Sequence, residues 1–149
     1  MSRRWTEIMS KQEMLGYLKE YLKQKGYKKQ KQTWYRINQD HIYVLLNVQN
    51  SQWDRETYYI NLGAGLIRQS TMKNFSSSNS DFQYRMDDGI GIERMKNKLT
   101  QWEDMFNSEL SVLHYWDYIS TPLRSYTLIK ADTIEYFNEL KRKMESQPG

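Results

Sequence analysis

The stretch TWYRINQDHIYVLLNVQNSQWDRETYYINLGAG, residues 33–65, decides the fold that we expect for this chain. It holds three segments in which apolar and polar side chains alternate, at 33–38, 41–49 and 56–62. Alternation is typical of a β-strand, because successive side chains point to opposite faces of a sheet. The turn-forming residues at 38–40 predict that the first two strands form an antiparallel hairpin.

The strand predicted at 41–49 has two faces of different character. Its apolar face, which we expect in the core, consists of Ile42, Val44, Leu46 and Val48. The opposite face combines rings and amides from this strand and the strand at 56–62, namely Tyr43, Asn47, Gln49, Tyr59 and Asn61. An antiparallel sheet can leave one face in water. The second face is therefore either a working surface or a second buried layer, in which Asn47 and Asn61 could pair across the sheet.

Helices are predicted on both sides of the strands. Apolar residues recur at steps of three and four in 6–25, 92–106 and 131–145, and Ser10 with Glu13 has the spacing of a capping box. Strands are also possible at 81–86 and 124–129, whereas 108–119 fits a helix or a strand. Residues 28–32 and the polar run NFSSSNSD at 74–81 are interpreted as loops, and Gly63 and Gly65 as the end of the third strand.

These patterns predict an α+β fold in which an antiparallel sheet of roughly three to five strands carries N-terminal, central and C-terminal helices mainly on one face. We expect residues 1–149 to form a single globular domain, with a frayed tail at 146–149.

The composition excludes several classes of site. The chain has 149 residues, a net charge of +4 and no cysteine, which rules out disulfides, thiolate metal sites and cysteine nucleophiles. No segment has the length and apolarity of a signal peptide or a membrane span, so we expect a cytoplasmic protein without membrane association. The positive charge is concentrated in residues 1–31, where nine lysines and arginines face three glutamates.

No catalytic or cofactor motif is present, so we predict neither an enzyme nor a cofactor or metal site. The histidines, His41 and His114, have no metal-ligand spacing. The carboxylate pairs at 87–88 and 103–104 are interpreted as a turn and as the polar side of a helix. The glycines at 61–65 and 88–91 lack the residues of a phosphate-binding loop.

Two binding surfaces are candidates. Large rings beside amide groups are typical of protein interfaces, which predicts a partner-binding surface made of Tyr43, Asn47, Gln49, Trp53, Tyr59 and Asn61. The alternative is a cationic stacking surface for single-stranded RNA or DNA, formed by Lys25, Lys28, Lys29, Lys31, Trp34 and Arg36.

Several spaced motifs resemble a known family. The series Gly26-Tyr27-Lys28-Lys29, Trp34-Tyr35-Arg36, Val48-Gln49-Asn50-Ser51 and Tyr59-Ile60-Asn61-Leu62-Gly63 is similar to the bacterial family called domain of unknown function 4304, over roughly residues 10–65. The resemblance implies a bacterial cytoplasmic α+β domain and no established enzyme activity. Domains of this kind look similar to the small immunity proteins encoded beside secreted bacterial toxins. We therefore expect a non-enzymatic protein-binding module of this type, whose partner could be a toxin domain; the identity of the partner and the oligomeric state stay open.

Overall fold

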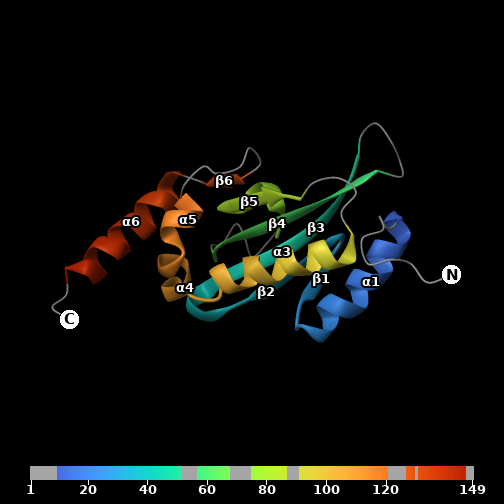
Figure 1. Cartoon of the computed structure of the whole chain (residues 1–149), viewed down its shortest axis with the longest axis horizontal. Helices are drawn as coiled ribbons and strands as arrows, with labels where there is room; N and C mark the ends of the chain where they lie inside the picture. Colours follow the sequence, from blue (N-terminus) through green and yellow to red (C-terminus); the bar gives the residue numbers. More distant parts are fainter. Residues whose placement is uncertain are drawn as a thin grey trace.

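The computed structural model describes residues 10–51, 57–67, 75–86, 91–120, 127–129 and 131–146. At its centre is an antiparallel sheet in which each strand pairs with the next strand along the chain (Figure 1). The described part of the sheet has six strands, namely β1 (Lys28–Gln30), β2 (Thr33–Ile37), β3 (Ile42–Asn50), β4 (Tyr58–Leu66), β5 (Phe82–Arg85) and β6 (Thr127–Ile129). The predicted α+β class with an antiparallel sheet is confirmed.

The helices gather on one side of the sheet, as predicted (Figure 1). The α-helices are α1 (Lys11–Gln24), α3 (Ile92–Met105), α4 (Glu109–His114), α5 (Trp116–Ser120) and α6 (Ala131–Glu145), and the short 3-10 helices are η1 (Gln39–His41) and η2 (Ser77–Asn79). α3 crosses the face of the sheet, whereas α1 and α6 lie toward opposite ends of the long axis (Figure 1). The segment 108–119, which fitted either a helix or a strand, is helical.

The capping box predicted at the start of the first helix is confirmed. The N–H of Glu13 donates to the hydroxyl of Ser10 at 3.2 Å, and the N–H of Ser10 donates to the Glu13 carboxylate. These bonds satisfy N–H groups that have no partner within a helix. α1 therefore begins at Lys11 with Ser10 as its N-cap, and residues 6–9 of the predicted helix lie outside the described residues.

The core lies between the helices and the face predicted to be apolar. Ile42, Val44, Leu46 and Val48 are all buried there, together with residues of α1, α3 and α6 such as Met14, Leu18, Leu99 and Phe137, and with Phe106 at the end of α3. Burying one such side chain contributes about 1.5–3 kcal/mol. The indole N–H of Trp102 donates to the carbonyl of Gly63 at 2.8 Å, which attaches α3 directly to β4.

The opposite face carries a second, smaller cluster. Phe75 is buried against Tyr43 and Leu45, and its ring stacks on Tyr35 with 3.9 Å between centroids. The described part of the loop predicted at 74–81 contains only the short 3-10 turn η2 as regular structure, and Phe75 packs this loop against the sheet. The second face is therefore covered around Tyr35, Tyr43 and Leu45 by this loop, and not by the helices that the structure describes.

The close approach of this segment explains the glycines of β4. A Cβ atom on Gly63 would lie 2.5 Å from the hydroxyl oxygen of Ser80, and one on Gly65 would lie 2.4 Å from Oδ2 of Asp81. Glycine leaves room for such an approach. The prediction that Gly63 and Gly65 end the strand was wrong, because β4 continues to Leu66.

The interpretation of 28–32 as a connector was wrong for residues 28–30, whereas residues 31–32 do form a turn. Lys28–Gln30 pairs antiparallel with β2 and forms the edge of the sheet. Exposed lysines on an edge strand discourage pairing with other chains, and they also remove the apolar alternation by which a strand is recognised. None of the helices in the described ranges is long and apolar enough to cross a bilayer.

Candidate functional site

A row of polar side chains crosses the second face of the sheet. Thr33 of β2 lies directly opposite Asn47 of β3, which lies opposite Asn61 of β4, which in turn lies opposite Arg85 of β5. Directly opposed residues of an antiparallel pair project on the same side and come into contact. The register alone therefore lines up four polar side chains from four strands.

Hydrogen bonds connect this row and add Gln49. The side-chain amide of Asn47 donates to Thr33 Oγ1 at 2.9 Å, and that of Asn61 donates to Asn47 Oδ1 at 3.2 Å and to Gln49 Oε1 at 3.0 Å. The guanidinium of Arg85 donates to Asn61 Oδ1 at 3.0 Å and to Gln49 Oε1 at 2.9 Å. We call these five residues the polar ladder. The cross-strand pairing of the two asparagines, left open by the sequence, is present.

The polar ladder is buried along its base and open at one end. Asn61 is only 5% exposed and Asn47 is half-buried, whereas Gln49 is exposed. The guanidinium carbon of Arg85 lies 4.7 Å from the centre of the half-buried Tyr59 ring. Within the described part of the chain, no group accepts a hydrogen bond from the Nε2 of Gln49. The open end thus presents an amide donor, a stacked cation and an aromatic ring.

A depression of about 630 Å³ adjoins the ladder, and we call it the polar groove. Its walls are the β1–β2 turn at residues 30–33, the end of β3 at residues 47–50, and Phe75 with Ser76. The N–H of Phe75 donates to Oε1 of Gln30 at 3.2 Å, which connects the covering segment to β1. Lys31 at the rim has a φ of 57°, a backbone conformation that costs energy in residues other than glycine. Such strain is often found at functional sites.

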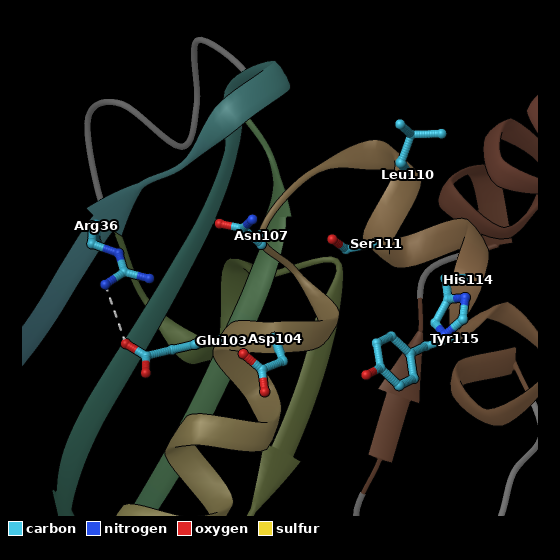
Figure 2. A pocket seen from close by; sticks show the side chains of 8 residues that line it. All are labelled: Arg36, Glu103, Asp104, Asn107, Leu110, Ser111, His114 and Tyr115. Atoms are coloured by element: carbon cyan, nitrogen blue, oxygen red, sulfur yellow. Dashed lines mark ion pairs between the residues drawn. The ribbon is translucent and has the colours of Figure 1, made fainter.

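A second depression, of about 730 Å³, lies on the helical side between β2, the end of α3 and α4. In Figure 2, Arg36 and Glu103 face each other at one end, with an ion pair of 3.3 Å, and His114 and Tyr115 lie at the other. His114 has no hydrogen bond to Ser111 or Asp104 among the described residues. A nucleophile activated by a base is therefore not assembled by these described side chains.

Glu103 is the buried charge of this region. Its carboxylate accepts from the hydroxyl of Tyr27 at 2.6 Å, and it pairs with the ammonium group of Lys25 and the guanidinium of Arg36. Burial raises the pKa of the Tyr27 phenol, and the negative charge of Glu103 raises it further. The prediction that Glu103 lies on the polar side of its helix was wrong, since it is 8% exposed. It thereby joins α3 to β2 and to the residues that follow α1.

The described residues contain no group of three or more His, Cys, Asp or Glu side chains that could hold a metal ion. This statement covers His41 and His114, but the carboxylates at 87–88 lie outside the described residues.

Comparison with known families decides the membership of this chain. The model of the family described as "Domain of unknown function (DUF4304)" matches residues 18–131. The chain belongs to the DUF4304 family. A search of curated proteins and a search of solved structures each returned no match. The resemblance noted over residues 10–65 is thus confirmed by a match that continues to the start of α6.

All five residues of the polar ladder lie within the part of the chain that matches DUF4304. Of the residues predicted to bind a partner, the structure brings Asn47, Gln49 and Tyr59 together at the open end of the ladder and the groove. Tyr43 does not belong to an accessible surface, because the segment containing Phe75 covers it and leaves it 1% exposed. Asn61 is likewise an internal connector of the ladder, and Trp53 lies outside the described residues.

The residues predicted to form a nucleic-acid surface are distributed over different environments in this DUF4304 domain. Lys25 and Arg36 pair with Glu103, and the ring of Trp34 is 2% exposed. Lys28, Lys29 and Lys31 are exposed, with the ammonium group of Lys29 lying 5.2 Å from the centre of the Trp34 ring. Three accessible cations are therefore present, but the tryptophan predicted to stack on bases is not accessible.

Sequence reasoning missed Thr33, Arg85, Gln30 and Phe75. Arg85 lies in a segment that was predicted as a possible strand, but its place opposite Asn61 depends on the pairing register, which alternation alone does not give. Phe75 is the one aromatic residue in a run of small polar residues, and this contrast was the signal that the run packs against something.

Proposed function

We propose that this DUF4304 domain is a non-enzymatic protein-binding module that holds its partner with the polar groove and the open end of the polar ladder. The observation that carries the proposal is the polar ladder itself. Its amides and guanidinium are already fixed by hydrogen bonds to one another, so a partner does not have to order them. Groups ordered before binding lose less conformational entropy when the complex forms.

The types of side chain at the open end support the same function. Tyrosine and arginine are enriched among the residues that contribute most to protein–protein affinity, and here Tyr59 and Arg85 stack on each other next to the exposed Gln49. The groove beside them offers further amide and hydroxyl groups that suit a peptide backbone.

The finer part of the proposal is that the module is of the immunity-protein type, so that its partner is a toxin domain which it neutralises. Its support is the likeness of domains of this kind to small immunity proteins. A co-expressed toxin that loses its activity when this chain binds would support this part, and a partner whose activity is unchanged would contradict it.

The test is recovery of a partner with matched variants. The tagged chain is expressed in its native host, and proteins bound in stoichiometric amounts are identified by mass spectrometry. We expect Gln49→Ala and Tyr59→Ala to weaken binding of that partner about tenfold or more, a loss of about 1.4 kcal/mol. Gln24→Ala on α1 and Tyr118→Ala on α5 remove the same groups from exposed positions elsewhere and should leave binding unchanged. If the control variants lost as much partner binding as Gln49→Ala and Tyr59→Ala, the assignment of this surface would be overturned.

Binding of single-stranded nucleic acid is the second candidate, and the exposed Lys28, Lys29 and Lys31 favour it. A single-stranded RNA oligonucleotide titrated at rising salt concentration tests it, because contacts with phosphates weaken steeply as salt increases. Recovery of nucleic acid without a protein partner, removed by salt, would select this second function.

A further inference from the structure

The polar groove and the open end of the ladder carry positive charge. Lys31 lines the groove, and Arg85 ends the ladder. Lys28 lies opposite Tyr35 of β2, so it shares the face to which Tyr35, Leu45 and Phe75 belong. Three cations from β1, the β1–β2 turn and β5 therefore belong to the side of the sheet that carries the groove and the ladder.

No carboxylate in the described residues neutralises these three cations. Arg85 is held by the oxygen atoms of two neutral amides and by the Tyr59 ring. Asp81 lies on the same face but is 2% exposed, and its Oδ2 accepts from the N–H of Leu66 near the end of β4. The positive charges of Lys28, Lys31 and Arg85 are thus available to a partner. Lys25 and Arg36 differ, because both form ion pairs with Glu103.

The register sets the length of a ligand that would reach both ends. Gln30, Thr33, Asn47, Asn61 and Arg85 are opposed in five neighbouring strands. With strands roughly 4.8 Å apart, the row is roughly 19 Å long, and an extended chain covers that length with about six residues.

We infer that the groove and ladder take an extended acidic segment of the partner protein, roughly six residues long, with its carboxylates near Lys28, Lys31 and Arg85 and its backbone over the exposed amides. This inference rests on the proposed function and specifies the partner. Carboxylates pair with a guanidinium through two hydrogen bonds and with an ammonium group through charge. The exposed amide of Gln49 and the amide groups that line the groove provide donors and acceptors that match a peptide backbone.

An acidic peptide fits this surface better than a nucleic acid does. Binding of single strands depends on aromatic rings on which bases stack. The rings beside this groove are unsuited to stacking, because Phe75 is 5% exposed and already stacked on Tyr35. Tyr59 is covered on one side by the Arg85 guanidinium.

Fluorescence anisotropy with three labelled probes tests the inference: hexaglutamate, hexaglutamine and a hexauridylate oligonucleotide. We expect the full chain to bind hexaglutamate, with an affinity that falls as salt rises, and to bind the other two at least about tenfold more weakly. The double variant Lys28→Glu/Lys31→Glu should weaken the binding of hexaglutamate about tenfold or more. Lys19→Glu/Lys23→Glu on α1 changes the net charge equally at exposed positions and should have an effect of less than about twofold.

Several outcomes would overturn the inference: no binding of hexaglutamate, equal losses in the two double variants, or preference for the oligonucleotide. Lys28→Gln/Lys31→Gln, checked by circular dichroism, repeats the test without introducing new charge. The partner recovered with the tagged chain separates the two proposals. If Gln49→Ala weakens the binding of that partner but Lys28→Glu/Lys31→Glu does not, the proposed protein-binding function stands. The proposal that the partner binds through an acidic segment is then rejected. If neither change affects it, both are rejected.

Discussion

Glu103 shows at the scale of one residue how position in a helix can mislead. It follows Trp102 in α3 and precedes the exposed Asp104, so it was grouped with the polar side of the helix. The structure turns it toward β2, where it is buried and meets three donors. Burying a carboxylate is costly unless charge and hydrogen bonds compensate for the loss of water. The sequence contains all three donors, but their meeting depends on packing between α1, β2 and α3.

Tyr27→Phe tests this buried group through its pH dependence. Removing the hydroxyl leaves the ring in place but deletes a hydrogen bond to a charged acceptor, which should cost about 1.5–3 kcal/mol at neutral pH. The pKa of Tyr27 is higher in the folded than in the unfolded chain. Its contribution to the free energy of unfolding is therefore full below the unfolded value of about 10 and is lost as the pH rises above it.

We accordingly expect the difference in free energy of unfolding between the natural chain and Tyr27→Phe to shrink as the pH rises from about 9 to about 11. Urea unfolding at a series of pH values measures it. Tyr118→Phe, at an exposed position of α5, should show no such trend. The hydrogen bond to Glu109 raises the pKa of Tyr136 to about 12, but this residue is present in every variant and cancels from the comparison. A difference that stays constant with pH would contradict the burial of Tyr27 beside a charged Glu103.

β4 shows at the scale of one element which features alternation can predict. Alternation placed this strand correctly, and it also separated the side chains of β3 into a core face and a polar face. It failed at the two glycines, because a residue without a side chain has no place in a pattern of side chains. The reason for both glycines lies further along the chain, in Ser80 and Asp81. Contacts of this kind cannot be inferred from a strand's own sequence.

Gly65→Ala tests the packing of that segment on β4. The added Cβ would lie 2.4 Å from Oδ2 of Asp81, whose hydrogen bond to the N–H of Leu66 keeps it there. We expect the substitution to displace the segment and to destabilise the fold by about 1–3 kcal/mol, measured by urea unfolding.

Gly16→Ala is the matched control for this substitution. Gly16 lies inside α1, and a Cβ at this position would have no atom within 4 Å. The same chemical change should stabilise here by about 0.5–1 kcal/mol, because alanine is the better helix former. If Gly65→Ala proved neutral, the segment would not pack on β4 as closely as the structure indicates.

In the whole molecule, helices cover one face of the sheet and form the main core with it, whereas the other face carries a small cluster and the polar ladder. The apolar face was predicted almost completely, because its residues belong to strands with regular alternation. The candidate site was predicted in part: Asn47, Gln49 and Tyr59 were found from their strands, but the ladder also needs Thr33 and Arg85. Thr33 and Arg85 join the ladder only through the register of four strands, and Tyr43 is buried in the cluster where Phe75 packs against the sheet. Properties that depend on distant pairing were therefore the ones that the sequence left open.

Phe137 connects the C-terminal helix to the rest of the molecule. Its ring centre lies 5.3 Å from that of Trp116 in α5 and 6.1 Å from that of Phe82 in β5, and the side chain is 1% exposed. Three elements from separate parts of the chain thus meet at one residue. If they share one core, damage at this point should weaken the whole fold and not only α6.

We therefore expect Phe137→Ala to lower the free energy of unfolding by about 3–5 kcal/mol. Tryptophan fluorescence reports on the environment of residues such as Trp34 and Trp102, and circular dichroism reports on all the helices. The two urea transitions should coincide and shift together, as a single cooperative unit requires. Met144 is exposed on the same helix. Met144→Ala should change the free energy of unfolding obtained from either transition by no more than about 0.5 kcal/mol. Loss of helical signal in Phe137→Ala while the fluorescence transition stays unchanged would show that α6 unfolds independently of the sheet.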